Sequence, residues 1–274
     1  MRPPTRNNPV LPQRTKRDPV PRRERQRPPR PPTREVGPQR IAKLLARAGI
    51  ASRRDVERMI ADGRIALNGD VLTTPATLLE TLQGVTVDGK PVRPAGAARL
   101  FRFSKPQATL TAARDPKGRP TIYDKLPPGL PRLIPVGRLD FMTEGLLLMT
   151  NDGELKRQLE LPRTGVVRHY RARAFGEVSQ AALEALAEGV TIEGIRYGSI
   201  DANLERRNGR NCWIQMSLAE GKNREVRRVL AYLGLQVSRL IRTAYGPFDL
   251  AGIDVGEVAE VPRGQLEQFR ASLR

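Results

Sequence analysis

Apolar residues recur at helical spacing where the regular part of the chain begins. Four of them lie at positions i, i+3, i+4 and i+7, namely Ile41, Leu44, Leu45 and Ala48. This stripe predicts a helix that begins at Arg40 and ends at Gly49. A second helix is predicted from Ser52 to about Ala61, because the Ser52 side chain can cap its first turn together with Asp55.

After these helices the pattern changes to short alternating segments. Strands are predicted at 64–67, 71–72, 85–87 and 91–92, with Asn-Gly and Asp-Gly turns between them. The two helices leave five cations on their outer faces: Lys43, Arg47, Arg53, Arg54 and Arg58. Two short helices with a basic face beside a small sheet predict an RNA-binding module of about sixty residues. A solvated charged face would show the same pattern, so this alternative stays open.

Residues 94–99 are typical of a linker, and the chain beyond them mixes strands with a few helices. The predicted strands cover residues 100–104, 145–150, 166–174 and 213–218. The predicted helices cover residues 153–161, 179–188 and 222–233. Because strands and helices do not alternate regularly, we expect an α+β fold with a largely antiparallel, mixed sheet.

The first 40 residues differ in composition from the rest of the chain. They hold eleven Arg, one Lys and eleven Pro against three acidic residues. Frequent Pro and repulsion between Arg side chains predict a disordered basic tail, which either attracts phosphate or only keeps the chain in solution. We therefore expect three parts: the tail at 1–39, the RNA-binding domain at 40–98 and a second domain at 99–274.

Composition excludes several classes of protein and site. No stretch approaches the roughly 18 consecutive apolar residues of a membrane helix, and no apolar segment after the first charges predicts a secretory signal. One Cys and one His exclude a disulfide framework and the usual Cys/His zinc site. The chain also lacks a Walker loop, a dinucleotide-binding Gly motif and a nucleophile elbow. With a net charge of +19 over 274 residues, the expected partner is nucleic acid, and no metal, cofactor or membrane is expected.

One carboxylate stands out as a candidate for chemistry. Asp140 follows Gly137 and precedes the apolar run 145–150, so a rigid strand would hold its loop in place. An Asp in this position can also simply close a turn, and the spacing alone does not choose between the two roles.

Several motifs resemble known families. Residues 40–72, with Ala48-Gly49-Ile50-Ala51-Ser52-Arg53-Arg54 at their centre, resemble the α-L RNA-binding module of a small-subunit ribosomal protein and of tyrosyl-tRNA synthetases. Gly137-Arg138-Leu139-Asp140 and Thr150-Asn151-Asp152-Gly153 resemble the central motif of pseudouridine synthases of the RsuA type. The segment from Glu220 to Arg228 resembles a later motif of that family. The family's Asn-Lys-Pro-x-Gly stands here as Ser104-Lys105-Pro106-Gln107-Ala108.

This resemblance implies a reaction and a set of site residues. The family breaks the N1–C1′ bond of a uridine, turns the uracil and joins C5 to C1′, without metal or cofactor. The resemblance makes Asp140 the catalytic carboxylate, Arg227 its cationic partner and Tyr170 the ring that packs on the flipped base. It also implies RNA contacts by Lys105, Arg138, Lys222, Asn223 and Arg224. Around Tyr170, the side chains of Arg168, Arg171 and Arg173 suit phosphates.

The basic tail and the sequence Thr143-Glu144-Gly145 are most similar to the B-type members of the family, which modify RNA of the large ribosomal subunit. We therefore expect a monomer that modifies 23S rRNA, free or in a pre-ribosomal particle, in a bacterial cytoplasm. Two alternatives are a 16S rRNA enzyme and an RNA-binding assembly factor that has lost catalysis.

Overall fold

The structure, a computed structural model, describes residues 37–273. Residues 1–36 of the predicted basic tail lie outside the described residues. Within the described range, no helix has the length and apolar character needed to cross a membrane.

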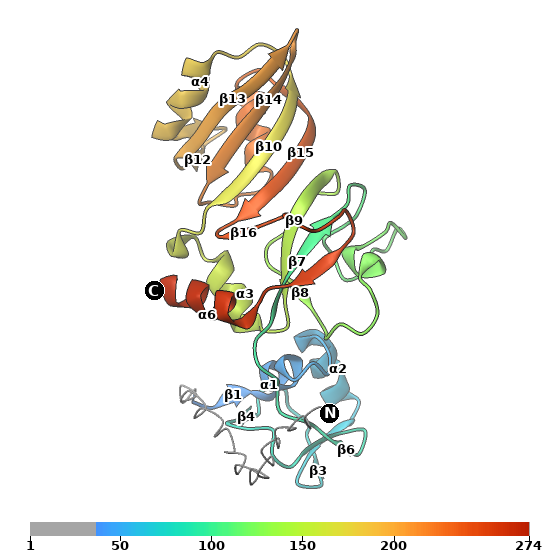
Figure 1. Ribbon diagram of the computed structural model, residues 1–274. Coiled ribbons are helices and arrows are strands. Elements are labelled where there is room, and N and C mark those ends of the chain that lie inside the picture. The colour runs from blue at the N-terminus through green and yellow to red at the C-terminus, as the bar shows by residue number, and fades with distance from the viewer. Residues whose placement is uncertain (1–36, 274) are drawn as a thin grey trace, which may run out of the picture. The chain divides into compact units, whose positions relative to one another are not determined.

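The N-terminal module forms the two predicted helices and a small sheet (Figure 1). Helix α1 spans Ile41–Arg47 and α2 spans Arg53–Ala61, and the Ser52 hydroxyl caps α2 by accepting a hydrogen bond from Asp55 N at 3.1 Å. Its sheet has the order β3-β2-β5-β6. The strands are β2 (Ile65–Leu67), β3 (Asp70–Val71), β5 (Val85–Val87) and β6 (Lys90–Pro91), and a separate pair joins β1 (Gln39–Arg40) to β4 (Leu78–Leu79). The apolar stripes of both helices pack on β2 and β5 as one core.

A long sheet builds the rest of the chain, in the order β13-β14-β10-β15-β9-β7-β17. These strands are β7 (Leu100–Lys105), β9 (Thr143–Thr150), β10 (Arg168–Phe175), β13 (Ile200–Asn208), β14 (Asn211–Leu218), β15 (Gln236–Tyr245) and β17 (Val258–Glu260). Short strands β8 (Ile134–Pro135) and β16 (Phe248–Asp249) pair with β9 and β15, and β11 (Val190–Ile192) forms a hairpin with β12 (Ile195–Tyr197). Neighbouring strands are antiparallel except β9 and β15, which confirms the expected α+β class with a largely antiparallel sheet.

The sheet divides into two halves at this parallel pair. Pairing between β15 and β9 covers only Leu240 with Thr143, Ile241 with Glu144 and Arg242 with Gly145. In one half, α4 (Gln180–Glu184) and α5 (Glu225–Tyr232) pack on one face of the sheet. In the other, α3 (Gly153–Glu160) and α6 (Arg263–Ser272) lie side by side and share a core (Figure 1).

Four of the longer elements differ from the prediction or were not predicted. The helix expected at 222–233 begins only at Glu225, because Arg224 adopts a left-handed backbone with φ of +52° that a continuous helix cannot contain. The helix expected at 179–188 is divided into α4 and a 3₁₀ turn, Ala185–Glu188. The long strands β13 and β15 were not predicted at all, because their charged residues mask the alternation that identifies a strand.

Candidate active site

A cavity of about 870 Å³ opens where the two halves of the sheet separate. Its lining includes Asp140 from the loop before β9, Tyr170 from β10 and Arg242 from β15. Arg227, from α5, also lines it. The cavity therefore collects side chains from segments that lie far apart in the sequence.

Side chains from other segments hold the Asp140 loop in place. Thr111 Oγ1 accepts a hydrogen bond from Leu139 N at 3.2 Å and donates one to Leu139 O at 2.9 Å. Gly137 N donates to Glu160 Oε1 at 2.6 Å, and Thr143 N donates to Asp140 O at 3.0 Å. The loop is thus pinned on both sides of the carboxylate, as a positioned catalytic group requires.

Lys105 lies beneath this loop and does not reach the surface, so the expectation that it contacts RNA is wrong. Its side chain is fully buried, and Nζ donates to the carbonyl oxygens of Pro106, Asp140 and Thr143 at 3.0, 3.3 and 2.8 Å. Burial lowers the pKa of the Lys105 ammonium to about 8, although the charges of Asp140 and Glu144 oppose this shift. Lys105 supports the backbone of the Asp140 loop, and its three N–H donors are all directed at carbonyl oxygens.

Two guanidinium groups face the Asp140 carboxylate. Asp140 Oδ2 lies 3.3 Å from Arg224 Nη1 and 3.7 Å from Arg227 Nε. The Arg227 side chain is 15% exposed and that of Arg224 is 52% exposed. Burial lowers the pKa of Arg227 from its ordinary value, and the charge of Arg224 adds to this effect, while Asp140 opposes it. The pairing of Asp140 with Arg227 was expected, whereas the nearer contact with Arg224 was not.

The Asp140 carboxylate is only partly enclosed by the protein. The Asp140 side chain is 30% exposed, so the cavity around it is open to solvent. A bound nucleotide would have to complete the dry environment that favours the reaction.

Tyr170 lines the same cavity from the centre of β10. It stands opposite Met216 of β14 and Arg242 of β15, and its partly buried side chain packs against the apolar clusters on both sides of the cavity. A flat ring on a rigid strand can stack on an unpaired base.

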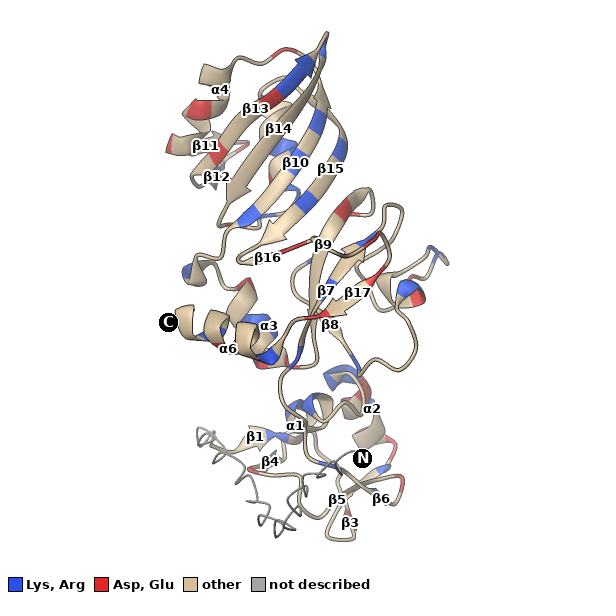
Figure 2. Cartoon of the chain, in the orientation of Figure 1, with Lys and Arg blue, Asp and Glu red and all other residues tan. Residues whose placement is uncertain are grey.

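The arginines around Tyr170 have different surroundings from those expected. Arg168 is buried, and its guanidinium donates to the carbonyl oxygens of Val166, Ala219 and Glu220 and to the Tyr245 hydroxyl, so it does not face phosphate. Arg171 pairs with Glu205 and covers the Trp213 ring. It alternates with the buried Ala172 and therefore lies on the face of the sheet opposite α4 and α5. Figure 2 shows Lys and Arg along β10, β13 and β15.

Other expected RNA contacts lie at the edge of the cavity. Arg138, Lys222, Asn223 and Arg224 are exposed residues that line it. The Lys222 ammonium already has two partners in the protein, because Nζ donates to Arg196 O at 2.7 Å and pairs with Glu220.

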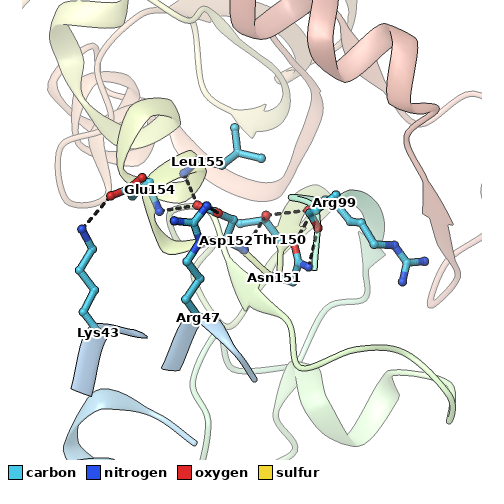
Figure 3. Close-up of polar contacts among 9 residues, drawn as sticks. Lys43, Arg47, Arg99, Thr150, Asn151, Asp152, Glu154 and Leu155 are labelled. Atoms are coloured by element: carbon cyan, nitrogen blue, oxygen red, sulfur yellow. Dashed lines mark hydrogen bonds and ion pairs between the residues drawn. The ribbon is translucent and has the colours of Figure 1, made fainter. Parts of the chain in front are cut away.

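The five cations of the N-terminal helices fall into two groups. Arg53, Arg54 and Arg58 of α2 are exposed. On α1, by contrast, Lys43 Nζ pairs with Glu154 Oε1 at 2.7 Å, and Arg47 Nη2 pairs with Asp152 Oδ2 at 3.2 Å (Figure 3). The two α1 cations thus contact the start of α3, which differs from the free outer face that we expected.

The Thr150-Asn151-Asp152 motif makes these contacts possible (Figure 3). Asp152 Oδ1 accepts hydrogen bonds from the backbone of Glu154 and Leu155 and so caps α3. Thr150 Oγ1 donates to Arg99 O at 2.6 Å, and Asn151 Oδ1 accepts from Arg99 N at 2.7 Å. The motif therefore anchors the linker and α3, and it lies at the opposite end of β9 from Asp140.

Several polar atoms of residues that line the cavity have no hydrogen-bond partner among residues 37–273. Of the buried side-chain polar atoms without a hydrogen bond in the described residues, four belong to residues that line it: Thr143 Oγ1, Glu225 Oε1, Arg227 Nε and Arg242 Nη2. The same residues, 37–273, contain no group of three or more His, Cys, Asp and Glu side chains that could hold a metal ion. The cavity thus brings the Asp140 carboxylate, the Tyr170 ring and several hydrogen-bond donors together, a set suited to a flipped base. Sequence reasoning missed Arg242, because it stands in an alternating strand with no motif around it.

Comparisons with known proteins agree with this geometry. The chain matches the family model described as RNA pseudouridylate synthase over residues 99–232 and that of the S4 domain over residues 39–81. It is 43% identical over 225 residues to an uncharacterised RNA pseudouridine synthase of Rickettsia bellii, covering 82% of this chain and 97% of the relative. It is 39% identical over 241 residues to ribosomal large subunit pseudouridine synthase B of Salmonella typhimurium, covering 85% of this chain and 82% of the relative.

A crystal structure of a pseudouridylate synthase has the same fold, with a TM-score of 0.58 at 24% identity over 83% of this chain and 98% of that chain. Three observations indicate the same family: the motifs around Asp140, the cavity that these motifs line, and the similarity to relatives over most of their length. The chain belongs to the RNA pseudouridylate synthase family, with an S4 domain ahead of the catalytic domain.

Proposed function

We propose that this protein converts a uridine of large-subunit ribosomal RNA, 23S rRNA in bacteria, into pseudouridine. The observation that carries the proposal is the Asp140 carboxylate, held in a pinned loop between two guanidiniums and sharing a cavity with Tyr170. The choice of RNA is supported by relatives named as large-subunit enzymes, such as that of Salmonella typhimurium.

Each cavity residue has a role in this proposal. Asp140 is the catalytic carboxylate, which attacks the nucleotide or removes a sugar proton. Tyr170 stacks on the flipped uracil, and its hydroxyl can accept the C5 proton at the end of the reaction. Arg227 orients the carboxylate and balances its charge once substrate has displaced water.

RNA binding is divided between the two domains. We assign residues 40–98 to RNA docking, with the exposed Arg53, Arg54 and Arg58 as its phosphate contacts. Residues 99–274 carry catalysis, with Arg138, Lys222, Asn223 and Arg224 holding the strand that enters the cavity. The protein acts as a monomer in the cytoplasm, without metal or cofactor, on free rRNA or on a pre-ribosomal particle.

Pseudouridine mapping tests this function directly. A strain that lacks the gene should lose one or a few pseudouridines from 23S rRNA, and the wild-type gene should restore them. Asp140→Asn should restore none while its RNA affinity stays within a few-fold, because the amide keeps the shape and removes the charge. The matched control Asp254→Asn changes an exposed residue outside the cavity and should restore modification fully.

Other results would contradict parts of the proposal. A loss confined to 16S rRNA would make the protein a small-subunit enzyme. Unchanged pseudouridines in both rRNAs, with RNA binding intact, would make it an assembly factor. Full restoration by Asp140→Asn would remove Asp140 from catalysis.

A further inference from the structure

Arg242 is a buried cation in the cavity that the functions assigned above do not use. It is 2% exposed and stands on β15 between Tyr170 of β10 and Gly145 of β9. A side chain at position 145 would collide with the Arg242 backbone, so the glycine allows the two strands to approach at this point. Arg242 is therefore held at the floor of the cavity, where the two halves of the sheet part.

Only part of the Arg242 guanidinium is satisfied by the protein. Its Nε donates to Leu146 O at 2.7 Å, across the gap that opens after the last paired residues of β9 and β15. Its charged group lies over the Tyr245 ring, 5.2 Å from the centroid. Among residues 37–273 no carboxylate pairs with it, and Nη2 is buried without an acceptor. Because an unsatisfied buried charge is costly, this donor indicates an acceptor that arrives with the ligand.

The position of Arg242 deep in the cavity determines which part of a nucleotide can supply that acceptor. The phosphates stay in the RNA backbone at the opening, where the cations Arg138, Lys222 and Arg224 are exposed. A flipped base is the part that enters furthest, and Tyr170, next to Arg242 on the neighbouring strand, offers it a ring to stack on. The acceptor that reaches Arg242 is therefore a carbonyl oxygen of the base.

We propose that Arg242 is a further catalytic residue, whose Nη2 donates a hydrogen bond to O2 or O4 of the target uracil and stabilises the charge that forms there. This inference rests on the proposed pseudouridine synthase activity. When the N1–C1′ bond breaks, its electron pair leaves with N1, and the negative charge spreads to O2 and O4. The guanidinium stays protonated throughout, so the proton lost from C5 goes elsewhere. Its hydrogen bond strengthens as charge develops, and this difference accelerates bond breaking.

A substrate whose base is a better leaving group distinguishes this catalytic role from a purely structural role. Arg242→Gln keeps a planar donor and removes the charge. On an rRNA fragment with the mapped target uridine, it should slow single-turnover breakage of the N1–C1′ bond by about 10²-fold. Fluorine at C5 already stabilises the departing uracil anion. The same substitution should therefore cost at least ten times less on a fragment with 5-fluorouridine at the target, where loss of the N1–C1′ bond is again measured.

Two further variants complete the experiment. Arg242→Lys keeps a charge and should recover part of the rate on uridine. Arg168→Gln is the matched control, because Arg168 lines the same cavity but spends its donors on carbonyl oxygens and Tyr245. Any loss in Arg168→Gln should be equal on the two substrates. Thermal unfolding of each variant checks that it is folded.

Three outcomes would overturn the inference. An equal loss on both substrates for Arg242→Gln would show that the bridge to Leu146 is its only role. A loss of RNA affinity at full chemical rate would make Arg242 a phosphate contact, and an unchanged rate would leave it no role. If the wild-type protein forms no pseudouridine on any rRNA, both the proposed function and this inference are wrong. If wild type is active and Arg242→Gln reacts at the wild-type rate, only this inference is wrong.

Discussion

At the scale of single residues, the two guanidiniums beside Asp140 differ in burial, and we therefore expect them to differ in function. Arg227 is largely buried on α5, and packing of that helix fixes its position, whereas Arg224 is exposed just before the helix begins. We predict that Arg227→Ala lowers the single-turnover rate on saturating RNA by about 10²-fold with little change in affinity. Arg227→Lys should recover only part of this loss, because an ammonium lacks the planar fork.

Arg224→Ala is the comparison variant for this prediction. Since Arg224 is exposed at the opening of the cavity, its loss should mainly weaken RNA binding and reduce the salt dependence of the affinity. The assignment is wrong if Arg227→Ala loses affinity alone and reacts at the wild-type rate.

Lys105 makes a prediction about stability and pH. Its pKa is about 8 in the native protein and 10.5 in an ordinary environment. Between these values the unfolded chain binds more protons, so the contribution of Lys105 to the free energy of unfolding rises with pH, by at most about 1.4 kcal/mol per pH unit. Below pH 8 the cost of the buried charge is constant. Urea unfolding should show wild type gaining stability relative to Lys105→Met from pH 8 to pH 10.5.

A control separates burial from the general effect of high pH. Lys117→Met removes an exposed lysine. The free energy of unfolding of this variant should change with pH in the same way as that of wild type. A difference between wild type and Lys105→Met that does not change with pH would mean that Lys105 keeps its ordinary pKa.

At the scale of elements, the cations of α1 and α2 have different surroundings. The α1 cations pair with the acidic start of α3, while those of α2 remain exposed. We predict that Arg53→Ala and Arg54→Ala each weaken RNA binding and reduce the slope of log K against log salt by about 1, at an unchanged chemical rate. Arg47→Ala should instead lower the free energy of unfolding by about 1 kcal/mol, because it leaves the nearly buried Asp152 without its cation.

Filter binding over a salt series and urea unfolding together check this division. If Arg47→Ala reduces the salt slope as strongly as Arg54→Ala while stability is unchanged, α1 contacts RNA directly and the ion pair with Asp152 is incidental.

At the scale of the whole molecule, charge is concentrated at the N-terminus. Residues 1–38 contain ten Arg and one Lys against three acids, or +8 of the net +19. We predict that their deletion weakens RNA affinity and flattens its salt dependence, because fewer counterions are released on binding. The single-turnover rate on bound RNA should not change, since the cavity is built from residues 110–245. An unchanged salt slope would show that the tail serves something other than RNA.

Much of this protein could be predicted from local sequence. The i, i+3, i+4 stripe of Ile41, Leu44 and Leu45 and the Ser52 cap specified α1 and α2, because helices are stabilised by neighbours within four residues. The apolar run before Asn151 specified β9, and with it the loop that holds Asp140. Motif resemblance then supplied the chemistry of that loop, including its pairing with Arg227.

Tertiary structure alone decided what each cation does. Arg168, Arg171 and Arg242 look alike in the sequence, yet one is saturated by carbonyl oxygens, one pairs with Glu205 and one keeps a free donor at the floor of the cavity. Their partners Glu220, Glu205 and Leu146 lie 52, 34 and 96 residues away, at distances that no local period can encode. Lys105 illustrates the same limit, because only the packing of β7 beneath the Asp140 loop buries an ammonium that the sequence presents as a surface charge. Periodicity determines which elements form, but the free energy of a charge depends on what surrounds it in three dimensions.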